Sequence, residues 1–155
     1  MKASLRRSGL RIGSAALTLA LAASSAEAQR GPVERVMIPT LQSADKDLGV
    51  QAAEAIRNRL TRETNVKELI VVPKADINNS LQSSGYSTTE ALAPGDAKAL
   101  ASLVRAAQYL DGSVARTPTG YRIDARLVLS RDLTRGQVLP TAQAAKLDDA
   151  ANQIA

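Results

Sequence analysis

The sequence predicts a mixed α/β domain, with two long helices packed on one face of a mixed sheet of about five strands. Three observations lead to this prediction. Two short apolar runs each end at a proline, a helical pattern follows each run, and alternating apolar and polar residues come after the second long helix. Short apolar runs are typical of buried strands, whereas strict alternation is typical of strands with one exposed face. The predicted order of elements is therefore β-α-β-α-β-β-β-α.

The first strand and the first long helix open the domain. Residues 34–39 form a compact apolar run that ends at a proline, which predicts a strand. A helix is predicted over residues 48–60, where apolar residues recur at every fourth position. Asp45 or Asp47 is expected to cap it, because an aspartate accepts hydrogen bonds from the free N–H groups of a first turn. The polar face of the helix, which includes Arg57, is expected to be solvated.

The second unit repeats the strand and the helix with a loop between them. Residues 69–73 contain four apolar residues without alternation, which favours a strand buried on both faces of the sheet. A short helical turn over residues 76–81, capped by Asp76, and a long polar loop over residues 78–89 are predicted next. The second long helix opens near Pro94, because proline suits a first helical turn. Its predicted buried stripe consists of Ala97, Leu100, Ala101, Val104 and Ala107.

The last third of the chain predicts a meander of strands and a short final helix. Residues 117–120 place proline second and glycine fourth, the preference of a type I turn. Residues 121–129 alternate strictly and form the clearest amphipathic strand of the chain. A second polar turn is predicted over residues 131–136 and a third strand over 137–145. Residues 147–154 predict a helix of about two turns.

The predicted core is aliphatic, because the chain has no Phe or Trp and only three Tyr. Single-face spacing on the helices and strands predicts that five aliphatic residues are buried together between the two long helices and the sheet. These residues are Ile56, Val71, Leu100, Val104 and Ile123.

Residues 1–28 have the pattern of a secretory signal peptide. Basic residues come first, a short apolar segment spans residues 12–23, and Ala26-Glu27-Ala28 is an A-x-A cleavage site. Cleavage after Ala28 predicts a periplasmic protein with a disordered lead-in over residues 29–33 and no stable membrane anchor; an uncleaved anchor is the alternative. Residues 34–155 are then one domain, which the sequence allows to be the head of a longer protein.

Charge and composition exclude several classes of function. Residues 29–155 keep 16 of the 20 basic and 14 of the 15 acidic residues, a net charge of +2. With this balance and few aromatic residues we expect no binding to nucleic acid. The chain has no Cys, which excludes disulfides and a lipidated cysteine at the cleavage site.

The sequence predicts no catalytic, cofactor or metal site. His and Cys, the best suppliers of bases, nucleophiles and metal ligands, are both absent. Two carboxylate pairs remain, Asp45 with Asp47 and Asp148 with Asp149, and their place at predicted helix starts favours capping over cation binding. Gly112-Ser113-Val114 lacks the second glycine of a nucleophile elbow, so we expect the glycine to allow close approach of strands.

Two candidate interaction surfaces follow from the pattern. Arg122, Asp124 and Arg126 share the polar side of one strand, where a cross-strand ion pair with Arg116 or a neighbour is expected and a ligand-facing strip is the alternative. Tyr86 lies in the predicted long loop, and long loops and tyrosines are both common at interfaces, although a merely flexible loop is the simpler interpretation.

The order of several short motifs resembles a known family. Val36-Met37-Ile38-Pro39 before the Leu48-Gly49 helix, Val71-Val72-Pro73, residues 96–101 and the run from Tyr109 to Val114 resemble the amino-terminal domain of the periplasmic protein TolB. They are also similar to TolB-like domains that precede tetratricopeptide repeats in bacterial envelope proteins, and to FlgO- and CsgG-type modules. The resemblance spans residues 34–155. No propeller or repeat array follows in this chain, and Arg105-Ala106-Ala107-Gln108 replaces the family's usual Leu-Gly-Ala turn.

The resemblance implies a fold with two long helices on one face of the sheet and no catalytic residues. Together with the composition, it predicts a non-catalytic, exported protein-interaction module of the bacterial cell envelope, with other envelope proteins as its partners. A periplasmic small-molecule or solute-binding domain is the alternative, which requires a concave pocket with convergent polar groups. A hydrolase is the third and weakest hypothesis, because no base is available.

Overall fold

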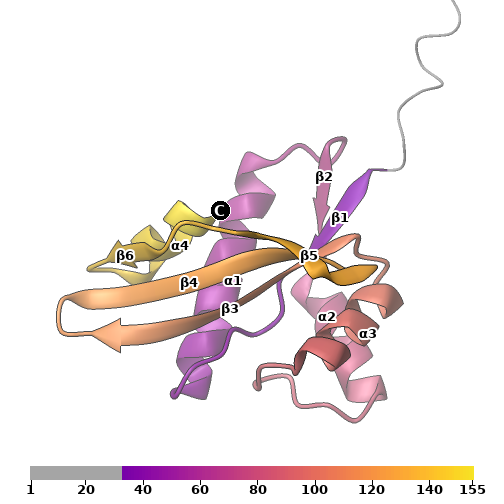
Figure 1. Ribbon diagram of the computed structural model, residues 1–155, viewed down its shortest axis with the longest axis horizontal. Coiled ribbons are helices and arrows are strands. Elements are labelled where there is room, and N and C mark those ends of the chain that lie inside the picture. Colours follow the sequence, from indigo (N-terminus) through magenta and orange to yellow (C-terminus); the bar gives the residue numbers. More distant parts are fainter. Residues whose placement is uncertain (1–32) are drawn as a thin grey trace, which may run out of the picture. The chain divides into compact units, whose positions relative to one another are not determined.

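The computed structural model describes residues 33–155 and confirms the mixed α/β class (Figure 1). The predicted signal peptide and residues 29–32 of the lead-in lie outside the described residues. Among the described residues there are four helices and six strands. In chain order they are β1 Glu34–Met37, α1 Lys46–Glu63, β2 Leu69–Val71, α2 Lys74–Ser83, α3 Pro94–Leu103, β3 Gln108–Thr117, β4 Gly120–Leu129, β5 Asp132–Val138, β6 Ala142–Ala144 and α4 Leu147–Ile154.

The strands form one mixed sheet in the order β2-β1-β3-β4-β5. β1 pairs in parallel with both β2 and β3, and the remaining pairs are antiparallel. β6 pairs with the first half of β4, and β5 pairs with its second half. The β3–β4 hairpin is therefore the centre of the sheet and carries ten matched residues in each strand.

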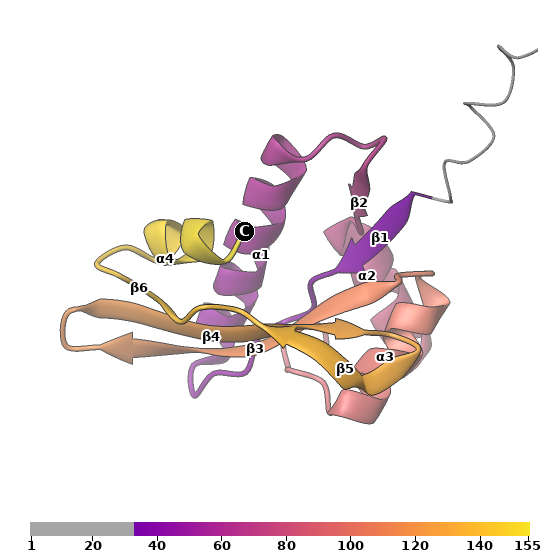
Figure 2. The same cartoon turned by 45° about the horizontal axis from the view of Figure 1, so that its top comes forward.

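The helices cover both faces of the sheet, which differs from the predicted arrangement on one face. One buried cluster joins α1 and α4 to Leu110 and Ile123, and a second joins α2 and α3 to Tyr109 and Val128. Tyr109 and Leu110 are neighbours in β3, so their side chains point to opposite faces. Figure 2 shows α1 and α4 on one side of the β3–β4 hairpin and α3 on the other. Ile56 and Ile123 thus lie in a different layer from Leu100 and Val104, and the five predicted core residues are not buried together.

The first long helix extends beyond its predicted ends because its capping groups lie further out. Asp45 is the N-cap, and its side chain accepts hydrogen bonds from the backbone N–H groups of Asp47 and Leu48. Eighteen residues are helical, against the 13 of the 48–60 prediction. Arg57 is not solvated: it is 8% exposed and donates from Nη2 to the carbonyl oxygen of Ile38 at 2.7 Å. Burial lowers the pKa of this guanidinium.

The segment after the second strand forms a full helix where only a turn was predicted. α2 has ten residues and begins after Pro73, so Asp76 lies in its first turn and does not cap it. Asn and Ser give this segment a weak intrinsic helix propensity, but Ile77 and Leu81 are buried one turn apart against α3. The predicted 78–89 loop is therefore shortened, and irregular structure spans residues 84–93.

The second strand is an edge strand, and the prediction of burial on both faces is wrong. Leu69, Ile70 and Val71 are each half-buried because β2 is the outermost strand, next to β1. Val72, just after the strand, is fully buried. The apolar run does form a strand, but its length does not indicate whether the strand lies at the centre or at the edge of the sheet.

The meander has the predicted first turn but not the predicted second one. Pro118 and Thr119 close the β3–β4 hairpin as expected. β4 and β5, however, are joined by Ser130 and Arg131 alone, and residues 132–136 already belong to β5. The register jumps from Val128 opposite Gly136 to Leu129 opposite Asp132, so a bulge absorbs the extra polar residues. The predicted third strand over 137–145 is divided between β5 and β6, which Pro140 separates.

The exit of α3 also differs from the prediction. The helix ends at Leu103, and Arg105 has a φ of 55°. This left-handed residue turns the chain, so Ala106 becomes buried where the predicted stripe has Ala107. Ala107 is exposed, and its N–H bonds the carbonyl oxygen of Arg35 at 2.9 Å.

Candidate functional site

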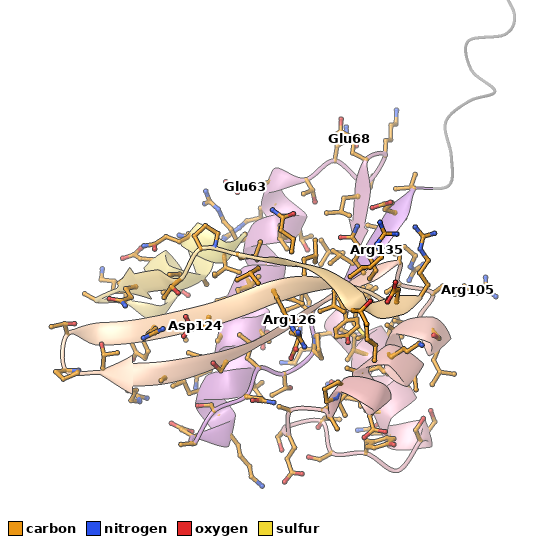
Figure 3. All side chains as sticks on the ribbon, viewed as in Figure 1. Glu63, Glu68, Arg105, Asp124, Arg126 and Arg135 are labelled. Atoms are coloured by element: carbon orange, nitrogen blue, oxygen red, sulfur yellow. The ribbon has the colours of Figure 1, made fainter. Side chains whose placement is uncertain are left out.

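The candidate site is the polar face of the β3–β4 hairpin. Alternation along β4 turns Ile123 and Ala125 toward α1 and α4, so Arg122, Asp124 and Arg126 lie together on the opposite face. Figure 3 shows Asp124 and Arg126 on this strand. The structure thus brings together the three strand residues that the sequence singled out.

Ion pairs organise this charged strip. Arg122 donates from Nε and Nη2 to the two carboxylate oxygens of Asp124, at 2.7 and 3.0 Å. Arg126 donates from Nε to Oδ2 of Asp111, its directly opposite neighbour on β3, at 2.9 Å. This second pair is the cross-strand type that the sequence predicted. Arg116 is not part of the strip: it packs 5.4 Å from the ring centroid of Tyr121, which lies on the α1 side of the sheet.

Asp124 and Arg126 of this strip line a shallow groove of about 320 Å³. The segment that leaves β5 also lines the groove, and its Thr141 donates a hydrogen bond to Oδ1 of Asp124 at 2.6 Å. Hydrogen bonds from Arg122 and from Thr141 hold the pKa of Asp124 below its ordinary value. The groove residues are Gln42, Asp111, Gly112, Ser113, Asp124, Ala125, Arg126, Val138, Leu139 and Thr141. Val138 is 79% exposed, so an apolar side chain stands unprotected at the rim of a charged groove.

Tyr86 lies elsewhere on the molecule. Its hydroxyl donates to Oδ1 of Asp96 at 2.7 Å, which raises the pKa of the tyrosine and ties its loop to the first turn of α3. It lines a small apolar cavity with Leu81, Leu92 and Leu100, and none of these residues lines the groove. The two candidate surfaces are therefore separate.

The carboxylate pairs stand at helix starts. Asp45 caps α1, and Asp148 and Asp149 lie in the first turn of α4. Within residues 33–155 there is no group of three or more His, Cys, Asp or Glu residues that could hold a metal ion. Gly112 sits where β3 and β4 come close, because a Cβ there would lie 2.4 Å from the carbonyl oxygen of Asp124. Among the same residues, no helix has the length and apolar character needed to cross a membrane.

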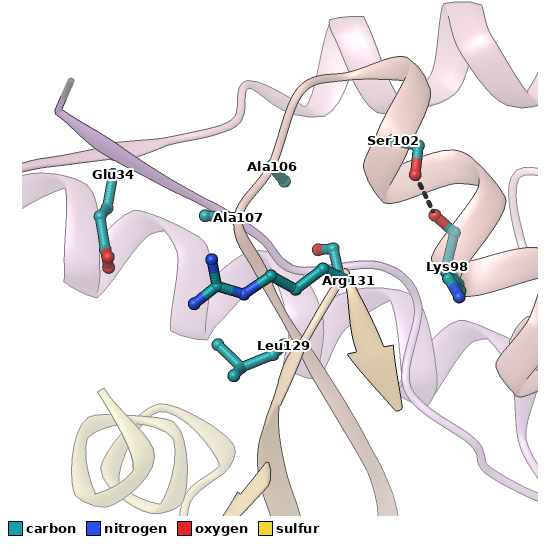
Figure 4. Close-up of a pocket in the computed structure, with 8 residues that line it drawn as sticks. Glu34, Lys98, Ser102, Ala106, Ala107, Leu129 and Arg131 are labelled. Carbon is teal, nitrogen blue, oxygen red and sulfur yellow. Dashed lines mark hydrogen bonds between the residues drawn. The ribbon is translucent and has the colours of Figure 1, made fainter. Parts of the chain in front are cut away.

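A second pocket, which no sequence pattern predicts, lies at the end of the sheet (Figure 4). Its volume is about 310 Å³. Its lining comes from the start of β1, from α3 and the residues just after it, and from the end of β4 with the turn that follows, segments that are distant in the sequence. The lining residues are Glu34, Lys98, Ser102, Ala106, Ala107, Leu129, Ser130 and Arg131. No periodicity or motif links these positions, so only the fold could reveal the pocket.

Comparison with known proteins identifies the fold but no family. No protein-family model and no curated protein matches the sequence. The resemblance to TolB-like domains therefore stays a prediction.

Solved structures of bacterial proteins share the fold. The LpoB C-terminal domain from Salmonella enterica matches with a TM-score of 0.53 and 17% identity, over 74% of this chain and 87% of that one. The same domain from Escherichia coli gives a TM-score of 0.52 and 17% identity, over 70% and 78%. Lipoprotein GNA1162 from Neisseria meningitidis gives a TM-score of 0.51 and 19% identity, over 73% and 78%. At these identities the likeness concerns the fold alone.

Proposed function

We propose that this protein is a non-catalytic, exported protein-interaction module of the bacterial cell envelope. Its signal peptide is removed after Ala28, and residues 34–155 act as one periplasmic domain that binds other envelope proteins. The absence of His and Cys from the whole chain supports a non-catalytic role. The shared fold with a domain of LpoB and with a lipoprotein supports the envelope assignment. The finer assignment to a TolB-like family belongs to this proposal.

The observation that carries the proposal is the groove on the uncovered half of the β3–β4 hairpin. α1 and α4 cover one face of this part of the sheet, and Asp124 and Arg126 on the other face line an open groove. Asp124 and Arg126 are held by ion pairs before any partner arrives, which lowers the entropy cost of binding. The exposed Val138 supplies an apolar contact beside them. An extended segment of a partner fits this combination.

Site-specific photo-crosslinking in the periplasm tests the groove. A crosslinker placed at Arg122, Arg126 or Thr141 should capture the same partner, because Arg126 and Thr141 line the groove and Arg122 is paired with the lining residue Asp124. A crosslinker at Arg62, in the last turn of α1, is the matched control and should not capture that partner. Capture from Arg62 alone would place the contact surface elsewhere.

A charge exchange separates binding from folding. Asp111→Arg with Arg126→Asp keeps an oppositely charged cross-strand pair and should keep the thermal unfolding temperature close to that of the original protein. The same double variant reverses the charge pattern of the groove wall, so we expect it to lose the crosslinked partner. Unchanged capture by a folded double variant would contradict the groove assignment.

Export has its own test. Amino-terminal sequencing of the protein from a periplasmic fraction should start at Gln29. A cytoplasmic product that still begins at Met1 would contradict the periplasmic proposal.

A further inference from the structure

The pocket at the end of the sheet is a second site, distinct from the groove. The two share no lining residue. Its volume of about 310 Å³ is at the lower end of the range of ligand sites, so it suits a small molecule. It also has the mixture that such sites need, an apolar wall with a few polar groups. The wall consists of Ala106, Ala107 and Leu129.

The pocket carries one acidic and two basic side chains. Figure 4 shows Glu34 on one side and Lys98 on the opposite side, with Arg131 between them. Within residues 33–155, neither Lys98 nor Arg131 forms an ion pair. Glu34 accepts one hydrogen bond at Oε2, from Nε2 of Gln108 at 3.1 Å, which leaves its other oxygen for a ligand. One carboxylate and two cationic groups therefore face one small cavity.

A buried hydroxyl points to a missing partner. Ser130 is only 7% exposed, and its Oγ has no hydrogen-bond partner although its backbone N–H bonds the carbonyl oxygen of Ala107 at 3.0 Å. Buried hydroxyls are nearly always paired, because an unpaired one is destabilising. Ser130 lines the pocket next to Arg131, so rotation of its side chain toward the cavity can bring the hydroxyl to a ligand that supplies the partner.

We propose that this pocket binds a small zwitterion of the amino-acid type. The carboxylate of the ligand binds Arg131 and Lys98 and accepts a hydrogen bond from Ser130. The ammonium group binds Glu34, and a short aliphatic side chain contacts Ala106 and Leu129. This site is independent of the partner groove, so it can fail without affecting the proposed function.

Three matched probes test the two charges of the ligand. L-valine carries both groups, isovalerate lacks the ammonium and isobutylamine lacks the carboxylate. We expect valine to shift the amide NMR signals of residues 98–107 and 129–131, and to bind several-fold more tightly than either of the other two. Equal affinities of valine and isovalerate would overturn the proposal that the ligand is a zwitterion. No shifts at tens of millimolar valine, or shifts only at other residues, would overturn the site.

Charge-removing variants assign the ends of the ligand. Arg131→Gln should weaken valine and isovalerate binding several-fold and leave isobutylamine unchanged. Glu34→Gln should bring valine to the affinity of isovalerate. Arg62→Gln, an exposed arginine on α1 that does not line the pocket, is the control and should change none of the three affinities. Loss of valine binding in Arg62→Gln to the same degree would contradict the assignment.

Ser130→Ala gives a readout that a purely structural role would not move. Without ligand, this variant should unfold at an equal or higher temperature, because it removes an unpaired buried hydroxyl. It should bind valine more weakly than the original protein and so show a smaller rise in unfolding temperature when valine is added. A ligand-induced rise equal to that of the original protein would show that the hydroxyl does not contact the ligand, which contradicts the proposed binding mode.

Discussion

Asp124 is the most connected side chain of the charged strip. It accepts from both Arg122 and Thr141, and these bonds stabilise its charged form. Because its folded-state pKa is lowered, its contribution to stability is present above the unfolded-state value and is lost as the pH falls through the folded-state pKa. The side chain is 42% exposed, so this contribution stays below about 1 kcal/mol.

Arg122→Gln should therefore raise the pKa of Asp124 toward its ordinary value, and Thr141→Val should raise it by a smaller amount. The order follows from the charge of the guanidinium, which strengthens its hydrogen bonds to the carboxylate. Carbon-detected NMR titration of the Asp124 carboxyl measures both shifts. Arg62→Gln serves as the control and should leave the titration unchanged. An Asp124 pKa that does not respond to either substitution would mean that the strip is not paired in solution.

Gly112 allows β3 to approach β4 at the floor of the groove. A Cβ at this position would lie 2.4 Å from the carbonyl oxygen of Asp124 and 2.9 Å from the Cα of Ala125, and both are backbone atoms that cannot move alone. We expect Gly112→Ala to destabilise the domain by about 1–3 kcal/mol. Gly95→Ala is the matched control, because nothing lies within 4 Å of a Cβ there, and should be neutral or stabilising by up to about 1 kcal/mol. Chemical denaturation of both variants measures the difference.

At the residue scale, the sequence predicted which side chains share a face better than it predicted their partners. Alternation alone placed Arg122, Asp124 and Arg126 on one side of β4. The partner Asp111 depends on the register between β3 and β4, which a pattern within one strand does not contain. No pattern within one strand indicates the role of Ser130 either, since three distant segments form its environment.

At the scale of elements, the cap of α1 gives a direct test. Asp45 accepts hydrogen bonds from two backbone N–H groups, whereas Asp47 lies inside the first turn and acts only through its charge. Asp45→Ala should destabilise the domain by about 1 kcal/mol, and Asp47→Ala by less, about 0.3–1 kcal/mol. Thermal or chemical unfolding of the two variants provides the comparison. Equal losses would mean that charge and not capping fixes the start of the helix.

The elements that were predicted well each have a local sequence pattern that indicates their structure. α1, α3, α4 and the β3–β4 hairpin each have a periodic pattern or a turn residue that is independent of the rest of the chain. α2 and β5 do not. α2 is polar and becomes helical because Ile77 and Leu81 pack against α3. β5 includes a polar segment because a bulge shifts its register against β4. Their structure is set by tertiary contacts, which the local sequence does not show.

For the described domain as a whole, the class of fold followed from the order of elements. The face of the sheet on which each helix packs did not follow from it. The apolar pattern of a helix shows only that one side of the helix is buried. It does not show which face of the sheet that side packs against. The structure places α1 with α4 and α2 with α3 on opposite faces, so the sheet separates two clusters. β3 and β4 contribute residues to both, and they are the elements that join the two layers into one unit.

This arrangement predicts additive losses from substitutions in the two layers. Leu100→Ala, in the α3 layer, should cost about 2–5 kcal/mol, and Ile123→Val, in the α1 layer, about 0.5–1.5 kcal/mol. The double variant should lose the sum within about 0.5 kcal/mol, because the two residues belong to separate clusters on opposite faces of the sheet. Leu103→Ala, on the same helix but 63% exposed, is the control and should cost less than about 0.5 kcal/mol.

Chemical denaturation should show one transition in every variant, because β3 and β4 are shared by both layers. A strong coupling between Leu100 and Ile123 would restore the single core that the sequence predicted, and two transitions would show that the layers unfold separately.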